Sequence, residues 1–141
     1  MVHNEQPVTD EYLQSFVGKG YREGATGPDE WGCWELCVHI VAARGLYVPS
    51  NIFGWRKVLR KLEPGEKPRR FDIVLFNDQE TGVVAHAGTI WDEDNFLHSA
   101  KEFGGVVIDR LKRYPAGVRM IVRYREVPPS EAHDADAEIL L

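Results

Sequence analysis

Hydrophobic residues recur at two different spacings along the chain, and the change between them divides it into two parts. In the first part, apolar side chains return every three to four residues, which is the period of an α-helix. From about residue 71 onward, the apolar segments are short, rich in β-branched and aromatic residues, and separated by turn residues. Helices followed by successive strands predict an α+β fold.

Three helices are predicted in the first part of the chain, over residues 9–17, 31–44 and 51–63. Thr9 or Asp10 can cap the first, and a Gly-rich loop separates it from the second. Gly45 follows the second helix at the position where glycine is favoured after the last turn. The apolar residues of the third predicted helix fall on one side of it.

Five strands are predicted in the second part, over residues 71–77, 83–91, 95–100, 105–111 and 118–127. Segments such as DQETG and WDEDN separate successive strands. Strands joined by short turns pair antiparallel. We therefore expect N-terminal helices packed on a mostly antiparallel sheet of about five to six strands, with the 31–44 helix crossing the sheet.

Acidic residues are unevenly distributed. Of the 22 acidic residues, five lie after residue 125, where there is no Lys or Arg, so 17 acids and 17 bases precede them. A neutral body with an acidic tail gives no electrostatic support for nucleic-acid binding. We expect one domain over residues 1–127 and an acidic, flexible tail over residues 128–141.

No apolar run in the sequence approaches the roughly 20 residues needed to cross a bilayer. The first residues, MVHNEQPVTDEY, are polar and lack the apolar stretch of a Sec signal peptide. The sequence therefore predicts no membrane insertion, and synthesis in the cytoplasm without a Sec signal.

Cys33 and Cys37 are the two cysteines, one helical turn apart. Side chains about 6 Å apart on one helix face have poor disulfide geometry, and a zinc site needs two further ligands at a matching spacing. Cys33 falls at the predicted helix start, where free N–H groups and the helix dipole favour a thiolate and can stabilise an oxyanion. Cys33 is thus a candidate nucleophile, and Cys37 is expected in the core.

Two of the five histidines fall in adjacent predicted strands. His86 and His98 are twelve residues apart, on either side of the WDEDN turn, so the two side chains can lie next to each other. His39 is expected to face away from Cys33 on the same helix. A cysteine, a histidine base and a polar group that orients the histidine form the arrangement of a thiol protease.

Residues 18–125 resemble, in the right order, the NlpC-type cell-wall cysteine peptidases. The resemblance rests on GCWELCVHIVAARGLYVP, which is similar to the cysteine motif of the phage-tail branch, and on KPRRFDIVLF, VAHAGTIWDEDNFLHSA and GVVIDRLKRYPAGVRMIVRYR. It implies a papain-like fold with Cys33 as nucleophile, His86 as general base and His98 as the residue that orients it. Tyr21 matches a tyrosine that helps to line the oxyanion site; the alternative is an aromatic that only packs on the helix.

Three positions depart from the family pattern. Gly32 stands where the family has Asp, Glu35 where it has Gly, and Phe71 where it has Gly. A carboxylate in the first helical turn suits the helix dipole, but near Cys33 it raises the pKa of the thiol. We expect packing to accommodate Phe71.

The resemblance implies hydrolysis of peptidoglycan stem peptides between D-glutamate and the following diamino acid, with no metal or organic cofactor. It further implies a virion protein that acts at the host cell wall or periplasm, with phage tail-tip proteins as partners. Two alternatives stay open: a structural tail-assembly protein with reduced or no catalysis, which Gly32 and Glu35 favour, and an acyltransferase built on the same Cys–His pair.

Overall fold

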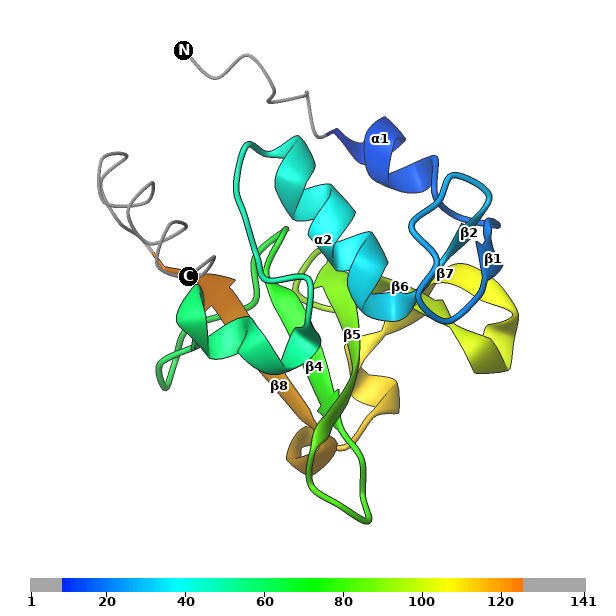
Figure 1. Ribbon diagram of the computed structural model, residues 1–141. Coiled ribbons are helices and arrows are strands. Elements are labelled where there is room, and N and C mark those ends of the chain that lie inside the picture. The colour runs from blue at the N-terminus through cyan, green and yellow to red at the C-terminus, as the bar shows by residue number, and fades with distance from the viewer. Residues whose placement is uncertain (1–8, 126–141) are drawn as a thin grey trace.

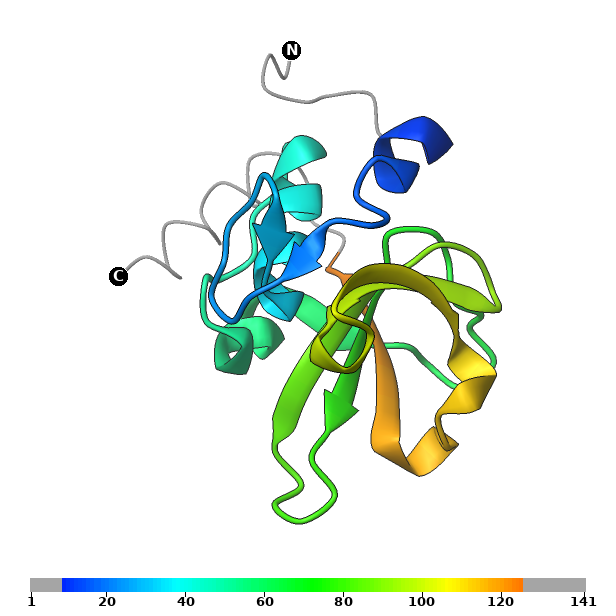
Figure 2. The same ribbon diagram turned by 90° about the vertical axis from the view of Figure 1, so that its right-hand side faces the viewer.

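The computed structural model of the protein describes residues 9–125. Helix α2 (Cys33–Ala43) lies across one face of a curved sheet, as Figure 1 shows, and Figure 2 shows the curvature from the side. Helices on one face of a mostly antiparallel sheet are the predicted α+β architecture. The tail expected over 128–141 lies outside the described residues.

The first two predicted helices are confirmed. α1 (Asp10–Gln14) begins after Thr9, whose hydroxyl accepts a hydrogen bond from the backbone N–H of Tyr12 at 3.1 Å. α2 ends just before Gly45, whose φ of 76° lies in the left-handed region that glycine adopts without strain. No helix among residues 9–125 has the length and apolar character to span a membrane.

The third predicted helix is wrong. The segment forms a 3₁₀ helix, η1 (Ile52–Lys57), followed by strand β3 (Leu59–Lys61), which pairs antiparallel with β8 (Arg119–Tyr124). Trp55, Val58 and Leu59 are all buried, as the apolar pattern required. Two elements bury them instead of one helix face, because pairing with β8 supplies the backbone hydrogen bonds of β3.

The sheet has eight strands, more than the five to six expected, in the order β2-β1-β7-β6-β5-β4-β8-β3. The additional strands are β3 and the pair from the Gly-rich loop, β1 (Gly20–Tyr21) and β2 (Glu30–Trp31). β1 and β2 pair in parallel, and every other neighbouring pair is antiparallel. The five predicted strands are present as β4 (Ile73–Asn77), β5 (Val84–Ile90), β6 (Asn95–Ala100), β7 (Gly105–Arg110) and β8.

Short strands such as β1 and β2 escape a periodicity analysis because they contain too few residues to alternate. Gly105, opposite Gly20, allows β1 to approach β7, since a Cβ on Gly105 would collide with the carbonyl oxygen of Lys19. Single 3₁₀ turns complete the connections after β6 and β7: η2 (Lys101–Phe103), η3 (Leu111–Arg113) and η4 (Ala116–Val118).

The two faces of the sheet bury different clusters of side chains, as the strand period of two requires. The face covered by α2 contributes Ile73, Leu75, Ala87 and Val122. The opposite face contributes Val74, Phe76, Ile90, Phe96 and Leu111. His86 and His98 belong to this second face, because His86 lies opposite Phe76 and His98 is two residues from Phe96 on β6, and both phenylalanines are members of the second cluster.

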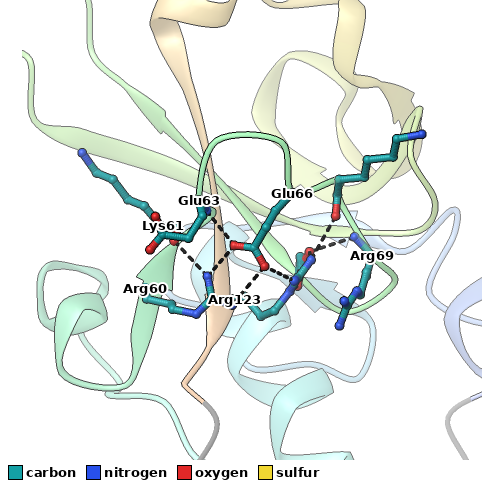
Figure 3. A network of polar contacts seen from close by, with 8 residues as sticks. Arg60, Lys61, Glu63, Glu66, Arg69 and Arg123 are labelled. Carbon is teal, nitrogen blue, oxygen red and sulfur yellow. Dashed lines mark hydrogen bonds and ion pairs between the residues drawn. The ribbon is translucent and has the colours of Figure 1, made fainter.

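An ion network with a buried Asp72–Arg123 pair fixes the start of β4. Arg123 and Asp72 form a bidentate pair, with both N–O distances 2.9 Å, and Asp72 is only 4% exposed. Arg60 lies directly opposite Arg123 in the β3–β8 register, and two cations at that spacing repel. Figure 3 shows how the carboxylate of Glu66 lies between them, 2.7 Å from Arg60 and 2.9 Å from Arg123. The network holds the loop before β4 against β8.

Candidate active site

The two cysteines have different environments, as predicted. Cys37 is 1% exposed within the core under α2, and the hydroxyl of Thr89 donates to its sulfur at 3.7 Å. Burial raises the pKa of Cys37 to about 12. Cys33, the first residue of α2, is partly exposed. Cys37 is confirmed as a core residue, and Cys33 as the accessible thiol at the helix start.

The electrostatic environment of Cys33 is mixed. Burial raises the pKa of its thiol, and the Glu35 carboxylate raises it further. The backbone N–H groups of Ala87, Trp34 and Cys33 itself oppose this and lower the pKa. The helix start does stabilise the thiolate, as the sequence predicted, but burial outweighs that contribution, because the thiol lies against the sheet and is only partly hydrated.

His86 and His98 are in direct contact, as the hairpin register predicted. Nε2 of His86 lies 2.7 Å from Nδ1 of His98. Gly88 lies between them on the same sheet face, where a Cβ would come within 3.0 Å of the His98 Cβ. The β4–β5 register shifts at Phe76/Asn77, which pair with His86 and Val84, so Ala85 is an extra residue next to His86. Such a bulge changes the direction of neighbouring side chains.

The hydrogen-bonded chain continues beyond the two histidines to residues that the sequence analysis missed. Nε2 of His98 lies 3.1 Å from Oδ2 of Asp109, and the hydroxyl of Tyr114 donates to the same oxygen at 2.9 Å. Asp109 lies on β7 and is 5% exposed. One signal was available: an aspartate inside the apolar strand segment GVVIDRL is unusual, and a buried carboxylate needs partners.

Burial determines the protonation of this chain. It lowers the pKa of His86 to about 4, and the neighbouring His98 contributes in the same direction. Burial also lowers the pKa of His98, although Asp109 opposes the shift. The pKa of Asp109 is lowered in spite of burial, because the backbone N–H of Arg110, the Tyr114 hydroxyl and His98 donate to the carboxylate. At neutral pH the chain consists of two neutral imidazoles and one carboxylate.

Cys33 and His86 approach each other through the main chain of β5. The backbone N–H that interacts with the Cys33 thiol belongs to Ala87, the residue after His86. Among residues 9–125, no hydrogen bond joins the thiol to the imidazole of His86. Catalytic hydrogen bonds are often long in proteins without substrate and shorten when the substrate binds.

A cavity of about 610 Å³ adjoins the histidines. His86 and His98 line it together with Phe76, Tyr114 and Glu102. Most of its exposed lining is apolar, although the polar residues Asn77, Gln79, Lys101, Glu102 and Tyr114 also contribute to it. This arrangement provides space for an organic group beside the candidate base.

Tyr21 lies on β1, opposite Trp31 of β2, at the approach to the first turn of α2. Burial raises the pKa of its hydroxyl, and the charge of Cys33 raises it further, so the two groups are within electrostatic range. This position is compatible with either predicted role of Tyr21, and the oxyanion role stays a prediction.

Two of the departures from the family pattern are physically linked. A Cβ on Gly32 would collide with Oε1 of Glu35, so the Glu35 carboxylate occupies the space that a side chain at position 32 would need. Gly32 caps α2 without a side-chain hydrogen bond. An acidic side chain at 35 therefore replaces one at 32 beside the helix start.

Comparison with known proteins is consistent with this geometry. The chain matches NlpC1 from Trichomonas vaginalis with a TM-score of 0.71 at 22% identity, covering 79% of this chain and 41% of that one. An NlpC/P60 family protein from Bacillus cereus gives 0.70 at 21% identity, with 84% and 39% covered. The peptidoglycan hydrolase RipB from Mycobacterium tuberculosis gives 0.61 at 20%, with 82% and 61% covered.

The chain thus spans less than two thirds of each of these proteins, and at such identities the likeness shows the shared fold. No curated protein matches the sequence significantly. The model of the NlpC/P60 family, in contrast, matches residues 18–123, from the start of the Gly-rich loop to the end of the sheet. The protein therefore belongs to the NlpC/P60 family.

Proposed function

We propose that the domain is a cysteine peptidase that cleaves peptidoglycan stem peptides. The observation that carries the proposal is the 2.7 Å contact between His86 and His98, with Cys33 at the start of α2 beside the next residue of the same strand. A nucleophile, a base and a group that holds the base form the minimum apparatus of thiol-dependent acyl transfer. Family membership and the likeness to a peptidoglycan hydrolase support a cell-wall substrate.

The proposed reaction has two stages. His86 takes the proton of the Cys33 thiol, and the thiolate attacks the amide carbonyl of the substrate. Backbone N–H groups at the start of α2 and the Tyr21 hydroxyl stabilise the oxyanion. His86 then protonates the leaving amine, and a water molecule hydrolyses the thioester, with His86 as the base. No metal or organic cofactor takes part.

The proposed bond joins D-glutamate to the following diamino acid, as the family resemblance implies. Its cleavage releases a product with a new free amine. The cavity beside His86 and His98 is mainly apolar and adjoins the group that protonates this amine. It is therefore the proposed location of the leaving part of the peptide.

We also propose that the protein acts as a phage tail component, with tail-tip proteins as partners and the host wall or periplasm as its place of action. The support is the similarity of GCWELCVHIV to the cysteine motif of the phage-tail branch. Mass spectrometry of purified virions that encode the chain tests this part: the protein should be present in tails, and its absence from them rules the role out.

The enzymatic proposal is tested by incubating purified protein with defined stem peptides and identifying products by mass spectrometry. Cleavage should produce the free diamino acid amine and should disappear in Cys33→Ala and in His86→Ala. Cys37→Ala is the matched control, because it removes the other thiol, which lies in the core, and it should still cleave. Cleavage that survives Cys33→Ala rejects the thiol mechanism.

A second candidate is a structural tail-assembly protein with little or no catalysis. The observation that favours it is the raised pKa of Cys33 together with the missing Cys33–His86 hydrogen bond among residues 9–125. The alkylation rate of Cys33 against pH distinguishes the two candidates. A thiol that reacts well below the pH of an ordinary free thiol, in a His86-dependent way, supports the peptidase; an ordinary thiol supports the structural protein.

A further inference from the structure

The contact between His86 and His98 has two possible directions. Nε2–H of His86 can donate to Nδ1 of His98, or Nδ1–H of His98 can donate to Nε2 of His86. The 2.7 Å distance fits both. Only the first direction leaves Nδ1 of neutral His86 with a free lone pair, because a neutral imidazole has one N–H and one acceptor nitrogen. A group outside the histidine pair must therefore determine the direction of this hydrogen bond.

Nδ1 is the nitrogen that has to be basic for the proposed reaction. Nε2 of His86 is already occupied by His98. Nδ1 is the ring nitrogen nearest the main chain of its own residue, and the Cys33 thiol interacts with the backbone N–H of Ala87, which follows directly. A proton on Nδ1 of His86 would leave this side of the imidazole unable to accept the thiol proton.

The hydrogen-bond partners of Asp109 determine this direction. Oδ2 lies 3.1 Å from Nε2 of His98 and accepts from the Tyr114 hydroxyl, while Oδ1 accepts from the backbone N–H of Arg110 at 2.8 Å. A carboxylate with these donors can only accept, so Nε2 of His98 must carry the proton. Neutral His98 then presents the Nδ1 lone pair to His86.

We propose that Asp109 is a positioning residue that sets the tautomers of two histidines in series, and so leaves Nδ1 of His86 unprotonated and able to act as the base for the Cys33 thiol. Asp109 acts through His98 and does not touch the reacting atoms. Tyr114 supports it by holding Oδ2 from the other side. The kinetic part of this inference rests on the proposed peptidase function, whereas the tautomers themselves do not.

The first test is NMR of the ring nitrogens in protein labelled with ¹⁵N-histidine near pH 7.5. In the wild type, His86 and His98 should both be neutral with the proton on Nε2. In Asp109→Asn, the side-chain amide can donate to Nε2 of His98, so both rings should shift toward the Nδ1–H tautomer. A charged His98 in the wild type, or tautomers that do not change in the variant, overturns the proposal.

Asp72→Asn is the matched control, since Asp72 is as buried as Asp109 but pairs with Arg123 on another part of the sheet. It lowers stability without a path to the histidines, so the tautomers should stay as in the wild type. If Asp72→Asn changes them as Asp109→Asn does, general loosening of the fold explains the effect and the proposal fails.

The second test is kinetic. Asp109→Asn should lower kcat by about 10²- to 10⁴-fold with KM nearly unchanged, as expected for a base held in the wrong tautomer. Asp109→Ala favours neither tautomer of His98. It should therefore be more active than Asp109→Asn, although its packing is worse. The reverse order contradicts the proposal. If the wild type cleaves no stem peptide while its tautomers are as expected, the proposed function fails and the role of Asp109 stands.

Discussion

Two buried aspartates lie in the same sheet with nearly equal exposure, 4% for Asp72 and 5% for Asp109, and they have different partners. Asp72 pairs with the guanidinium of Arg123, which stays protonated at any pH a protein tolerates, and Glu66 balances the charge of the neighbouring Arg60. Asp109 faces a neutral imidazole and a phenol, and the cation beside it, Arg113, lies 3.5 Å from Oδ1 with its side chain 55% exposed, so solvent screens much of that charge. The charges of the first network neutralise each other. The carboxylate of Asp109, in contrast, keeps a negative charge that can determine which nitrogens of the hydrogen-bonded histidines carry protons.

The difference separates a structural network from a candidate functional one. Four charged groups, two arginines and two carboxylates, hold a loop against β8 (Figure 3). The chain from Tyr114 to His86 contains groups that donate and accept in alternation and ends beside a cavity. Burial alone therefore does not identify a functional carboxylate, and the partner's ability to change its protonation does.

The largest expected effect comes from removing the cation of the buried Asp72–Arg123 pair. Arg123→Met leaves Asp72 buried without its cation, and we expect the free energy of unfolding to fall by about 3–5 kcal/mol, because a lone buried charge is costly. Urea denaturation followed by tryptophan fluorescence measures it.

The double variant Asp72→Asn with Arg123→Met should recover a large part of that loss, since no buried charge is then left alone. A double variant no more stable than Arg123→Met would show that the hydrogen bonds of Arg123, and not its charge pairing, dominate. Asp109→Asn removes the partner of Arg113, which is mostly exposed to solvent, and should therefore cost less than Arg123→Met, about 1–3 kcal/mol.

The next effect is the pH dependence of the histidine chain. His86 has a pKa near 6.5 when unfolded and about 4 when folded, so between these values only the unfolded chain takes up the proton. Stability from this residue is fully present above pH 6.5 and is lost as the pH falls toward 4, by about 3 kcal/mol over the whole window.

Denaturation at pH 7 and pH 4.5 tests this in the wild type and in His86→Asn, which should lose clearly less stability on acidification. Glu66 supplies the contrast from the other network: hydrogen bonds from Arg60 and from the backbone N–H of Glu63 lower its pKa to about 2, so it does not titrate in the same window. Equal slopes in both proteins would refute the assignment to His86.

A third carboxylate, Glu35, has neither kind of partner. Among residues 9–125 it forms no ion pair, and it contributes to the raised pKa of Cys33, after burial. Glu35→Gln should therefore lower the pKa of Cys33 and speed its alkylation a few-fold at mildly acidic pH.

Peptide mass spectrometry after iodoacetamide treatment measures this rate, with buried Cys37 as the internal reference that stays unmodified. Glu30→Gln is a matched surface control, because Glu30 pairs with Arg22 and should leave the rate of Cys33 unchanged. An unchanged rate in Glu35→Gln would show that the Glu35 carboxylate does not contribute to the reactivity of Cys33.

The smallest effect concerns Phe71, in the turn immediately before Asp72. Phe71 has a φ of 75°, where the family pattern has glycine, and its ring packs 4.7 Å from the Arg44 guanidinium. Phe71→Gly removes strain and packing together, so the net change in stability should stay within about 1 kcal/mol. Phe71→Ala keeps the strain and loses the packing, so calorimetry should find it less stable than Phe71→Gly.

The sequence predicted the parts of the site that depend on short-range pattern. Cys33 at a helix start follows from the apolar period of α2 and the glycine after it, and both are local. The contact of His86 with His98 follows from a hairpin register set by one turn. Each prediction spans about a dozen residues, within which backbone geometry nearly fixes the neighbours.

The parts that failed depend on distant segments. The second half of the third predicted helix became β3 because β8, some sixty residues later, pairs with it. Asp109 reaches His98 only because β7 lies beside β6 in one register and buries the carboxylate. The local signal, an aspartate within an apolar strand segment, does not show which partners the folded chain brings to its carboxylate.

The sequence by itself thus determined the fold class, the five main strands along the chain, and that Cys33 lies at a helix start whereas Cys37 is core. The tertiary structure alone decided that three edge strands extend the sheet, that Asp72 meets a permanent cation, and that Asp109 meets a titratable imidazole. The physical reason is range: apolar periodicity acts within one element, whereas the protonation of a buried group depends on whatever the folded chain places within hydrogen-bonding distance of it.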